Sequence, residues 1–249
     1  MEVHHHPQLE HKPKPWKEYF LEFLMIFIAV TLGFFAESLR EHISDGEKGE
    51  KYSHSFVEDL RKDTAALHHS IKRLKADIHN GERLIFLFDA DKLATQPDTV
   101  ILKLSVGCGL SVDVAFNDRT SSQLKGTGSM RLIQNKAVAD SMLQYWNNQI
   151  YLEQVHNRFE TMRMEEHNIG FKTFNWYLAY YNNVKTDNKN RLGVKKAIID
   201  KGRLNEFVNS ASVLYNLAST NYLPLLNSQL RLAESMIKII EKKQGPEME

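Results

Sequence analysis

The strongest constraint on this chain is an apolar run from Tyr19 to Ala36, in which Glu22 is the single charged side chain. A helix rises about 1.5 Å per residue, so the run covers roughly 27 Å, close to the thickness of a bilayer's hydrocarbon core. Three lysines precede it, and Trp16 and Tyr19 are residue types that favour the membrane interface. We therefore predict a single transmembrane helix over residues 19–36.

Two other readings of this run stay open. A cleaved secretory signal should end in small residues, whereas this run ends in Gly33-Phe34-Phe35-Ala36-Glu37, with bulky phenylalanines. A buried helix of a soluble protein is the second alternative, because the uninterrupted apolar part, Phe23 to Ala36, is only about fourteen residues long.

The charges flanking the run say little about orientation. Lys12, Lys14 and Lys17 precede it, and Arg40, Lys48 and Lys51 follow it, so the two sides are equally basic. A short basic N-terminus that stays inside, followed by a long exported domain, is the commoner arrangement for an uncleaved anchor. We expect a cytoplasmic tail (1–18), the transmembrane helix (19–36), an extracytoplasmic helical domain (37–243) and a disordered tail (244–249).

One face of the predicted span suits helix packing. At 100° per residue it combines an acidic residue with small ones, while phenylalanines lie on the opposite side. Small residues let helix backbones approach closely in lipid, and an acidic group in a span usually faces protein or water. An alternative interpretation gives Glu22 no functional role: its side chain reaches the lipid headgroups or is protonated. The predicted helix-packing residues are Glu22, Ile26, Ala29, Gly33 and Ala36.

Composition excludes some classes of function. The net charge of +1 gives no reason to expect a nucleic-acid partner. The single cysteine, Cys108, excludes an internal disulfide framework, and its position between Gly107 and Gly109 looks structural. About 200 residues follow the span, which is enough for a sizeable core.

Heptad-like seams predict long helices after the span. The first seam starts near Ser53, is broken by Gly81, and belongs to a helix that continues from the membrane, with Ser44-Asp45-Gly46 as a candidate joint. A second seam lies between Asn135 and about Tyr181. The first seam contains Val57, Leu60, Thr64, Leu67, Ile71, Leu74, Ile78, Ile85 and Phe88, and the second contains Val138, Tyr145, Leu152, Val155, Phe159 and Met162.

A last long helix is predicted from about Leu204 to Lys243, with Pro224 as a kink. Its inward residues are predicted to be Phe207, Ala211, Leu214, Ala218, Leu225, Leu232, Met236 and Ile239. The fold class expected is all-α, a single N-terminal transmembrane helix followed by an elongated antiparallel helical bundle with long coiled-coil-like helices.

Shorter elements are predicted between the long helices. Asp98 can cap a short helix, although the glycines at 107 and 109 leave helix and strand equally plausible up to Val114. Asn117-Asp118 caps a brief helix through Lys125 that Gly126 and Gly128 end, and Ser129 or Asn135 starts the next. A short helical piece is expected over residues 194–199.

No spacing of polar residues reaches the specificity of an active site. His68 with His79, and His156 with His167, are each about 16 Å apart along one helix, too far to share an ion. The pair Glu153 and His156 occurs once, whereas a di-iron bundle needs that motif twice. We therefore predict no catalytic residues, no metal and no cofactor, and a chain that is not an enzyme.

The segment Asn117 to Lys136, read with Phe23 to Glu41, resembles a family of uncharacterised single-pass membrane proteins of Bacteroidetes, grouped as a domain of unknown function. The resemblance covers the chain to about Tyr151 and the remainder more loosely. It implies the envelope of a two-membrane bacterium, with the chain in the inner membrane and its bulk in the periplasm. It also implies a specific helical corner over Gln123 to Ile133, with Gly126, Gly128 and Arg131 as structural or recognition residues.

Three functions follow as hypotheses. The leading one is a non-enzymatic accessory or scaffold subunit of an envelope complex, or a homo-oligomer, whose partners are membrane lipid and other integral membrane proteins or copies of itself. The second is a periplasmic sensor or ligand-binding module that works through a separate partner. The third is an ion- or proton-conducting oligomer that uses Glu22.

Overall fold

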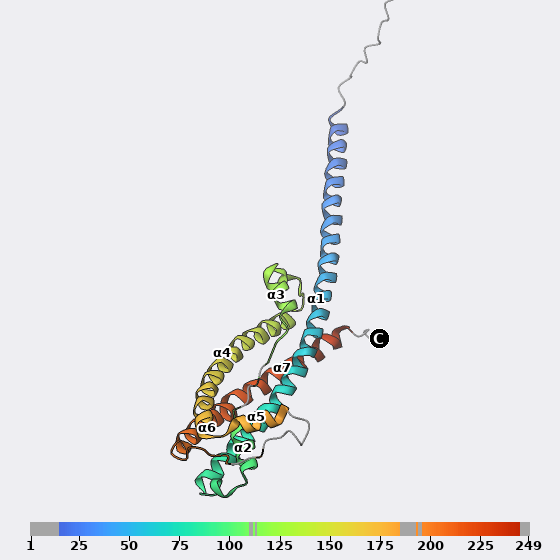
Figure 1. Ribbon diagram of the computed structural model, residues 1–249. Coiled ribbons are helices and arrows are strands. Elements are labelled where there is room, and N and C mark those ends of the chain that lie inside the picture. Colours follow the sequence, from blue (N-terminus) through green and yellow to red (C-terminus); the bar gives the residue numbers. More distant parts are fainter. Residues whose placement is uncertain (1–14, 110–111, 113, 185–192, 194–195, 245–249) are drawn as a thin grey trace, which may run out of the picture. The chain divides into compact units, whose positions relative to one another are not determined.

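The computed structural model describes residues 15–109, 112, 114–184, 193 and 196–244. The expected all-α fold is confirmed, because every regular element in these residues is helical and the only strand-like feature is an isolated bridge between Phe174 and Ile198. The helices are α1 (Trp16–Asp89), α2 (Asp98–Gly107), α3 (Arg119–Gly126), α4 (Lys136–Thr173), α5 (Trp176–Val184), α6 (Leu204–Leu217) and α7 (Leu223–Gln244), with short turns η1 (Leu93–Thr95), η2 (Ser129–Leu132) and a π-helical turn η4 (Ala218–Tyr222) (Figure 1).

The chain divides into two compact units, of which the first ends at Glu50 and the second begins at Lys51. In the first unit, α1 is helical from Trp16 onward, and none of its most apolar eighteen-residue window is buried. This helix is long and apolar enough to cross a membrane, by its length and composition. Residues 1–14 of the predicted cytoplasmic tail (1–18) lie outside the described part of the chain.

The predicted joint at Ser44-Asp45-Gly46 is wrong, because α1 runs through it without a break. Asp and Gly each cost less than about 1 kcal/mol inside a helix, too little to end one that is favoured on both sides. An ion pair between Lys48 Nζ and Asp45 Oδ1, at 3.1 Å, also spans this turn.

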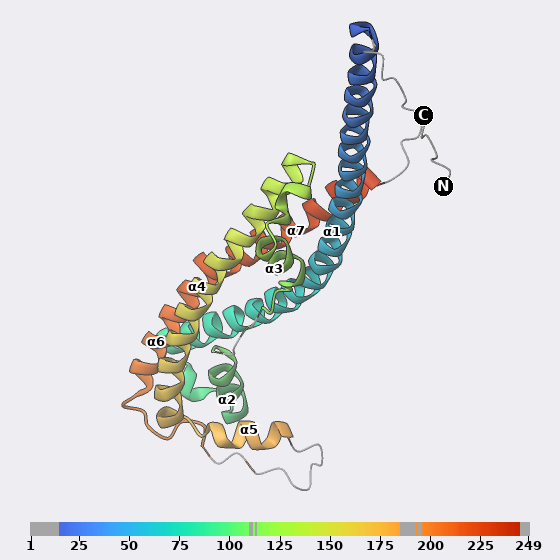
Figure 2. The same ribbon diagram turned by 90° about the horizontal axis from the view of Figure 1, so that it is seen from above.

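Three long helical segments dominate the second unit, namely α1 from Lys51, α4, and α6 with α7 (Figures 1 and 2), and they share three buried clusters. Phe56 of α1 shares a cluster with Tyr145 of α4 and Met236 of α7, whereas Leu84 shares another with Phe174 and Phe207. Residue numbers therefore rise together along α1 and α4 and fall along α6 and α7. The last two helices run antiparallel to the other two.

The seam of α1 is largely confirmed, with two corrections. Val57, Leu60, Leu67, Ile71 and Leu74 are buried as predicted, but the predicted break at Gly81 is wrong, because Gly81 is itself buried and a Cβ there would contact Cys108 and Tyr215. Beyond it, Leu84 and Leu87 are buried in place of Ile85 and Phe88, which are only partly buried. The buried face is wider than predicted and contains the heptad Phe56, Asp63, Ser70, Asp77 and Leu84.

The second seam is confirmed from Val138 to Phe159, but its helix ends at Thr173 instead of continuing to Tyr181. Phe174 adopts an extended backbone and pairs with Ile198, and the Asn175 N–H donates to Ala197 O at 2.9 Å. This pairing also holds residues 196–199 out of the helix predicted for them; residues 194 and 195 lie outside the described part. Tertiary pairing overrides the local pattern at both places.

The last predicted helix is divided at η4. Pro224 has no N–H to donate to Thr220 O, and its ring crowds that carbonyl, so a wider π turn precedes it and absorbs the kink predicted there. The changed turn shifts the inward face. Phe207, Ala211, Leu214, Ala218 and Met236 are buried as predicted, whereas Leu226, Leu230 and Ile240 are buried in place of the half-buried Leu225 and Leu232 and the exposed Ile239.

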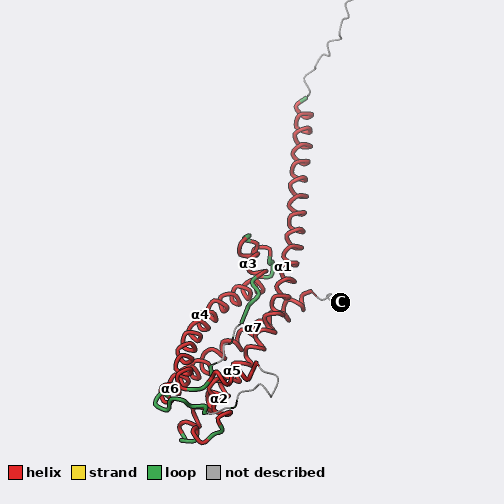
Figure 3. Tube along the Cα trace, in the orientation of Figure 1, coloured by secondary structure: helices red, strands yellow, loops and turns green. Residues whose placement is uncertain are grey.

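The segment from Val114 to Asp118, here called the crossover segment, runs along α1 into α3 (Figure 3). α2 is helical up to Gly107, and Pro97 is its N-cap. The predicted cap at Asp98 is therefore wrong; its carboxylate instead accepts a hydrogen bond from the Ala197 N–H, at 2.7 Å. The α4 cap is confirmed, since Asn135 Oδ1 accepts from the Ala137 and Val138 N–H groups.

Gly170 is the position at which this fold should tolerate a methyl group least. A Cβ there would lie 2.1 Å from the buried ring of Trp176. We expect Gly170→Ala to lower the free energy of unfolding by about 2–3 kcal/mol, as overpacking does. The matched control is Gly126→Ala, because a Cβ at Gly126 meets nothing within 4 Å. Urea unfolding followed by circular dichroism measures both, and equal stabilities would contradict the packing described.

Candidate functional site

The five predicted helix-packing residues occupy one face of α1 in the first unit. Ile26, Ala29, Gly33 and Ala36 are exposed, and Glu22 is half-buried. No described atom lies within 4 Å of the point where a Cβ on Gly33 would stand. A second helix could therefore approach this face closely at Gly33, which has no side chain.

The predicted corner contains a left-handed turn. Gly126 ends α3, and Gly128 has φ of +65°, a conformation that glycine adopts without strain. Leu124 and Ile133 anchor the corner in the core, while Arg131 is exposed. The three residues singled out by sequence thus lie together, and Gly128 shapes the turn.

Two buried carboxylates of α1 hold the crossover segment and α3. Asp63 Oδ1 accepts from the Asn117 N–H at 2.8 Å, and its Oδ2 accepts from the Tyr145 hydroxyl at 2.9 Å. Asp59 Oδ2 accepts from the N–H and the hydroxyl of Thr120, at 3.0 and 2.6 Å. Burial raises the pKa of Asp63, although the hydrogen bonds from Asn117 and Tyr145 oppose this shift.

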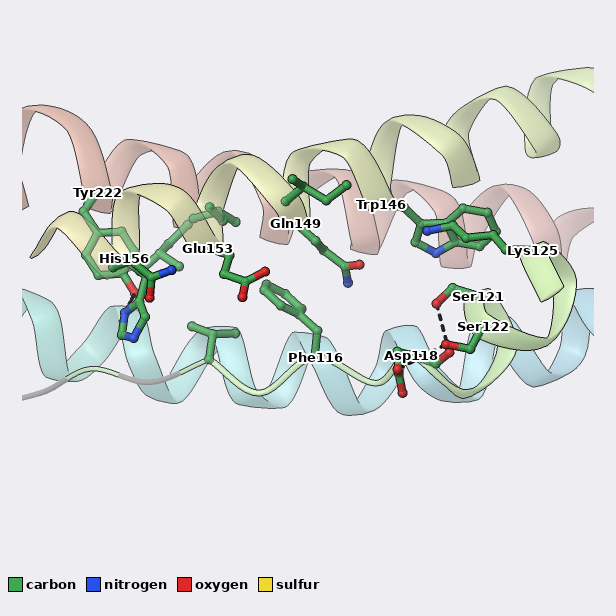
Figure 4. A pocket seen from close by; sticks show the side chains of 15 residues that line it. Phe116, Asp118, Ser121, Ser122, Lys125, Trp146, Gln149, Glu153, His156 and Tyr222 are labelled. Atoms are coloured by element: carbon green, nitrogen blue, oxygen red, sulfur yellow. Dashed lines mark hydrogen bonds between the residues drawn. The ribbon is translucent and has the colours of Figure 1, made fainter. Parts of the chain in front are cut away.

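A groove of about 500 Å³ lies between this segment and α4, with α3 at one end and η4 and α7 at the other (Figure 4). Pockets of this size commonly hold small molecules or short chain segments. Its walls are Val114, Phe116, Asp118, Ser121, Ser122, Lys125, Trp146, Gln149, Ile150, Leu152, Glu153, His156, Asn157, Tyr222 and Leu226.

The charged groups of the groove differ in whether they have partners. Lys125 Nζ lies 4.6 Å from the centre of the Trp146 ring, a cation–π contact, and Asp118 Oδ2 accepts from the Ser122 hydroxyl at 3.1 Å. No described residue donates a hydrogen bond or forms an ion pair with the exposed carboxylate of Glu153. That carboxylate points into the middle of the groove, beside the ring of Phe116 (Figure 4).

Among the described residues of the groove, no nucleophile is paired with a base. His156 Nδ1 lies 3.0 Å from the Tyr222 hydroxyl, which donates to Val112 O. Ser121 and Ser122 lie at the opposite end, where their hydroxyls donate to Asp118 (Figure 4). Neither serine is near an imidazole that could take its proton.

A second polar cluster is buried beside α2. The Cys108 thiol donates to Glu166 Oε1 at 3.5 Å, and Glu166 Oε2 lies 2.8 Å from His167 Nδ1. Burial, reinforced by the Glu166 charge, raises the pKa of the Cys108 thiol strongly, so the thiol stays protonated and is a poor nucleophile. A Cβ on Gly109 would stand 2.6 Å from Glu166 Oε2, which gives the glycine next to Cys108 the structural role expected.

Metal-binding geometry is absent from the described residues, in which no three His, Cys, Asp or Glu side chains gather around one point. His68 Nε2 lies 3.5 Å from Glu234, and His156 and His167 have the separate partners given above. The N-terminal histidines lie outside the described residues.

Sequence reasoning missed the buried acids Asp59, Asp63, Asp77 and Glu166. A signal for Asp63 and Asp77 was present, because they stand at heptad spacing between Phe56 and Leu84. The groove had no such signal, since its walls come from segments more than 100 residues apart in the chain.

Comparisons of the chain with protein-family models, with curated proteins and with solved structures find no match. The resemblance to the Bacteroidetes membrane family stays a prediction.

Asp77 should make stability depend on pH. Burial raises its pKa to about 7, and no described residue donates a hydrogen bond to its Oδ2. Between the unfolded pKa, about 3.9, and the folded one, the folded state keeps a proton that the unfolded state has lost, so the free energy of unfolding falls as pH rises. Above pH 7 this loss is complete.

The free energy of unfolding should therefore fall by about 2 kcal/mol less in Asp77→Asn than in the wild type when the pH is raised from 5 to 8. Urea titrations of both proteins in mild detergent measure it. Glu82→Gln, an exposed change on the same helix, is the control and should keep the wild-type slope. Identical slopes in wild type and Asp77→Asn would contradict the burial of an unpaired carboxyl.

Proposed function

We propose that this protein is a non-enzymatic, membrane-anchored helical protein that acts as an accessory or scaffold subunit of a cell-envelope membrane complex, or as a homo-oligomer. Residues 19–36 span the inner membrane, residues 1–18 stay in the cytoplasm, and the helical domain from residue 37 lies in the periplasm. The partners are lipid and other integral membrane proteins or copies of the chain.

One observation carries this proposal: the apolar window of α1 is wholly exposed, while every buried apolar side chain of the described residues lies in the second unit. Contiguous apolar surface of that extent is rare on a protein surrounded by water, and it marks a membrane or protein contact. The open approach at Gly33 supports a helix partner, because in lipid the close packing of backbones, and not the burial of apolar area, drives association.

The groove favours a second candidate function, that of a binding module in the same membrane-anchored chain. It offers apolar walls, a few convergent polar groups and an unpaired carboxylate, the features typical of a ligand site. The two functions are compatible, since one uses the first unit and the other the second.

Gly33→Leu tests the leading proposal. The added side chain should block the close approach of a second helix and lower the population of oligomer, or of a co-purified subunit, at least fivefold by native mass spectrometry in mild detergent. Thr31→Leu is the matched control, because position 31 lies about 160° around the helix from Gly33. A strictly monomeric protein that Gly33→Leu leaves unchanged would contradict the proposal.

A further inference from the structure

The crossover segment lines the groove with the side chains of Val114 and Phe116, and part of its backbone has no described partner. Val114, Ala115 and Phe116 are half-buried or exposed, and their backbone N–H and C=O groups make no hydrogen bond to another described residue. Asp63 fixes one end of the segment through the Asn117 N–H, and Tyr222 donates a hydrogen bond to the O of Val112. Figure 4 shows Val114 to Phe116 running lengthwise along the groove. A lengthwise segment with an unpaired backbone can be joined by another chain as a strand.

The dimensions of the groove suit a short extended peptide. On α4 its wall runs from Trp146 to Asn157, which is about 16 Å along a helix. At about 3.3 Å per residue, four or five extended residues cover that length. The rings of Phe116 and Trp146 and the side chain of Ile150 provide apolar contact for alternate side chains of such a peptide.

The charge of the groove selects the kind of peptide. Lys125 is held over Trp146 and Asp118 accepts from Ser122, whereas the carboxylate of Glu153 has no described partner. It lies at the middle of the groove, next to the Phe116 ring (Figure 4). A lysine or arginine there gains both the carboxylate and the face of an aromatic ring.

We propose that the groove binds an extended peptide segment with a basic side chain at its centre, which joins the Val114–Phe116 edge and places its cation against Glu153. This inference rests on the second candidate function above. It is independent of the helix-packing role of α1.

The test uses the full chain in mild detergent and three labelled pentapeptides followed by fluorescence anisotropy. The first is acetyl-Thr-Val-Lys-Val-Thr-amide, the second has Glu in place of Lys, and the third is the first with alternate backbone nitrogens methylated. We expect the Lys peptide to bind at least tenfold more tightly than the Glu peptide. Methylation should weaken binding at least tenfold, because it removes the main-chain donors.

Glu153→Gln should reduce the preference for Lys over Glu to twofold or less. Glu165→Gln is the matched control, since Glu165 is also an exposed carboxylate of α4 but does not line the groove, and it should keep the full preference. A preference that survives Glu153→Gln would overturn the inference, as would tight binding of the methylated peptide.

Native mass spectrometry of the protein isolated from its native membrane distinguishes the peptide inference from the more general binding function on which it rests. A retained peptide that Gln149→Trp, a groove-filling change, displaces supports both. A retained molecule of another class, displaced in the same way, overturns the peptide inference and leaves the binding function standing. Failure of every pentapeptide to bind overturns the inference.

Discussion

The second unit depends on two carboxylates buried in α1. Asp59 and Asp63 would be costly to bury alone, and they are satisfied by donors from Thr120, Asn117 and Tyr145. These bonds tie residues 117 and 120 to α1, and α4 then starts at the same end of the unit as Phe56 and runs in the direction of α1. The groove exists because the crossover segment is tied to α1 and leaves room between itself and α4.

The two units place their apolar residues differently. In the second unit leucines and aromatics form three buried clusters, and the exposed apolar residues, such as Phe86 and Phe171, are scattered along the chain. In the first unit, large residues such as Phe23, Ile26, Phe34 and Phe35 are exposed. Such a surface is stable in lipid, whereas the bundle is stable in water, and the proposed membrane anchor follows from that difference.

Periodicity predicted the parts of the fold in which local and tertiary preferences agree. The long helices, the caps at Asn135 and the turn at Gly128 follow from patterns of a few residues. Predictions were wrong where a distant partner decided the outcome. The helix end at Thr173 needs Ile198, and the shifted inward face of α7 needs the π turn before Pro224.

The candidate site was harder to predict than the fold. Acidic residues are normally solvent-facing, so the burial of Asp63 and Asp77 was not predicted although they occupy a buried heptad position. Their hydrogen-bond donors lie 54 or more residues away in the chain or, for Asp77 Oδ2, are absent from the described residues. The groove combines the crossover segment, α3, α4 and α7, and no local pattern encodes such a meeting.

Amide hydrogen exchange at Asn117 and Thr120 tests the central claim most directly, because their N–H groups donate to Asp63 and Asp59 and to nothing else described. If the carboxylates hold the crossover segment, these two amides exchange at least a hundredfold more slowly than that of Ala115, which has no described acceptor. Equal and fast exchange at all three positions would contradict the account.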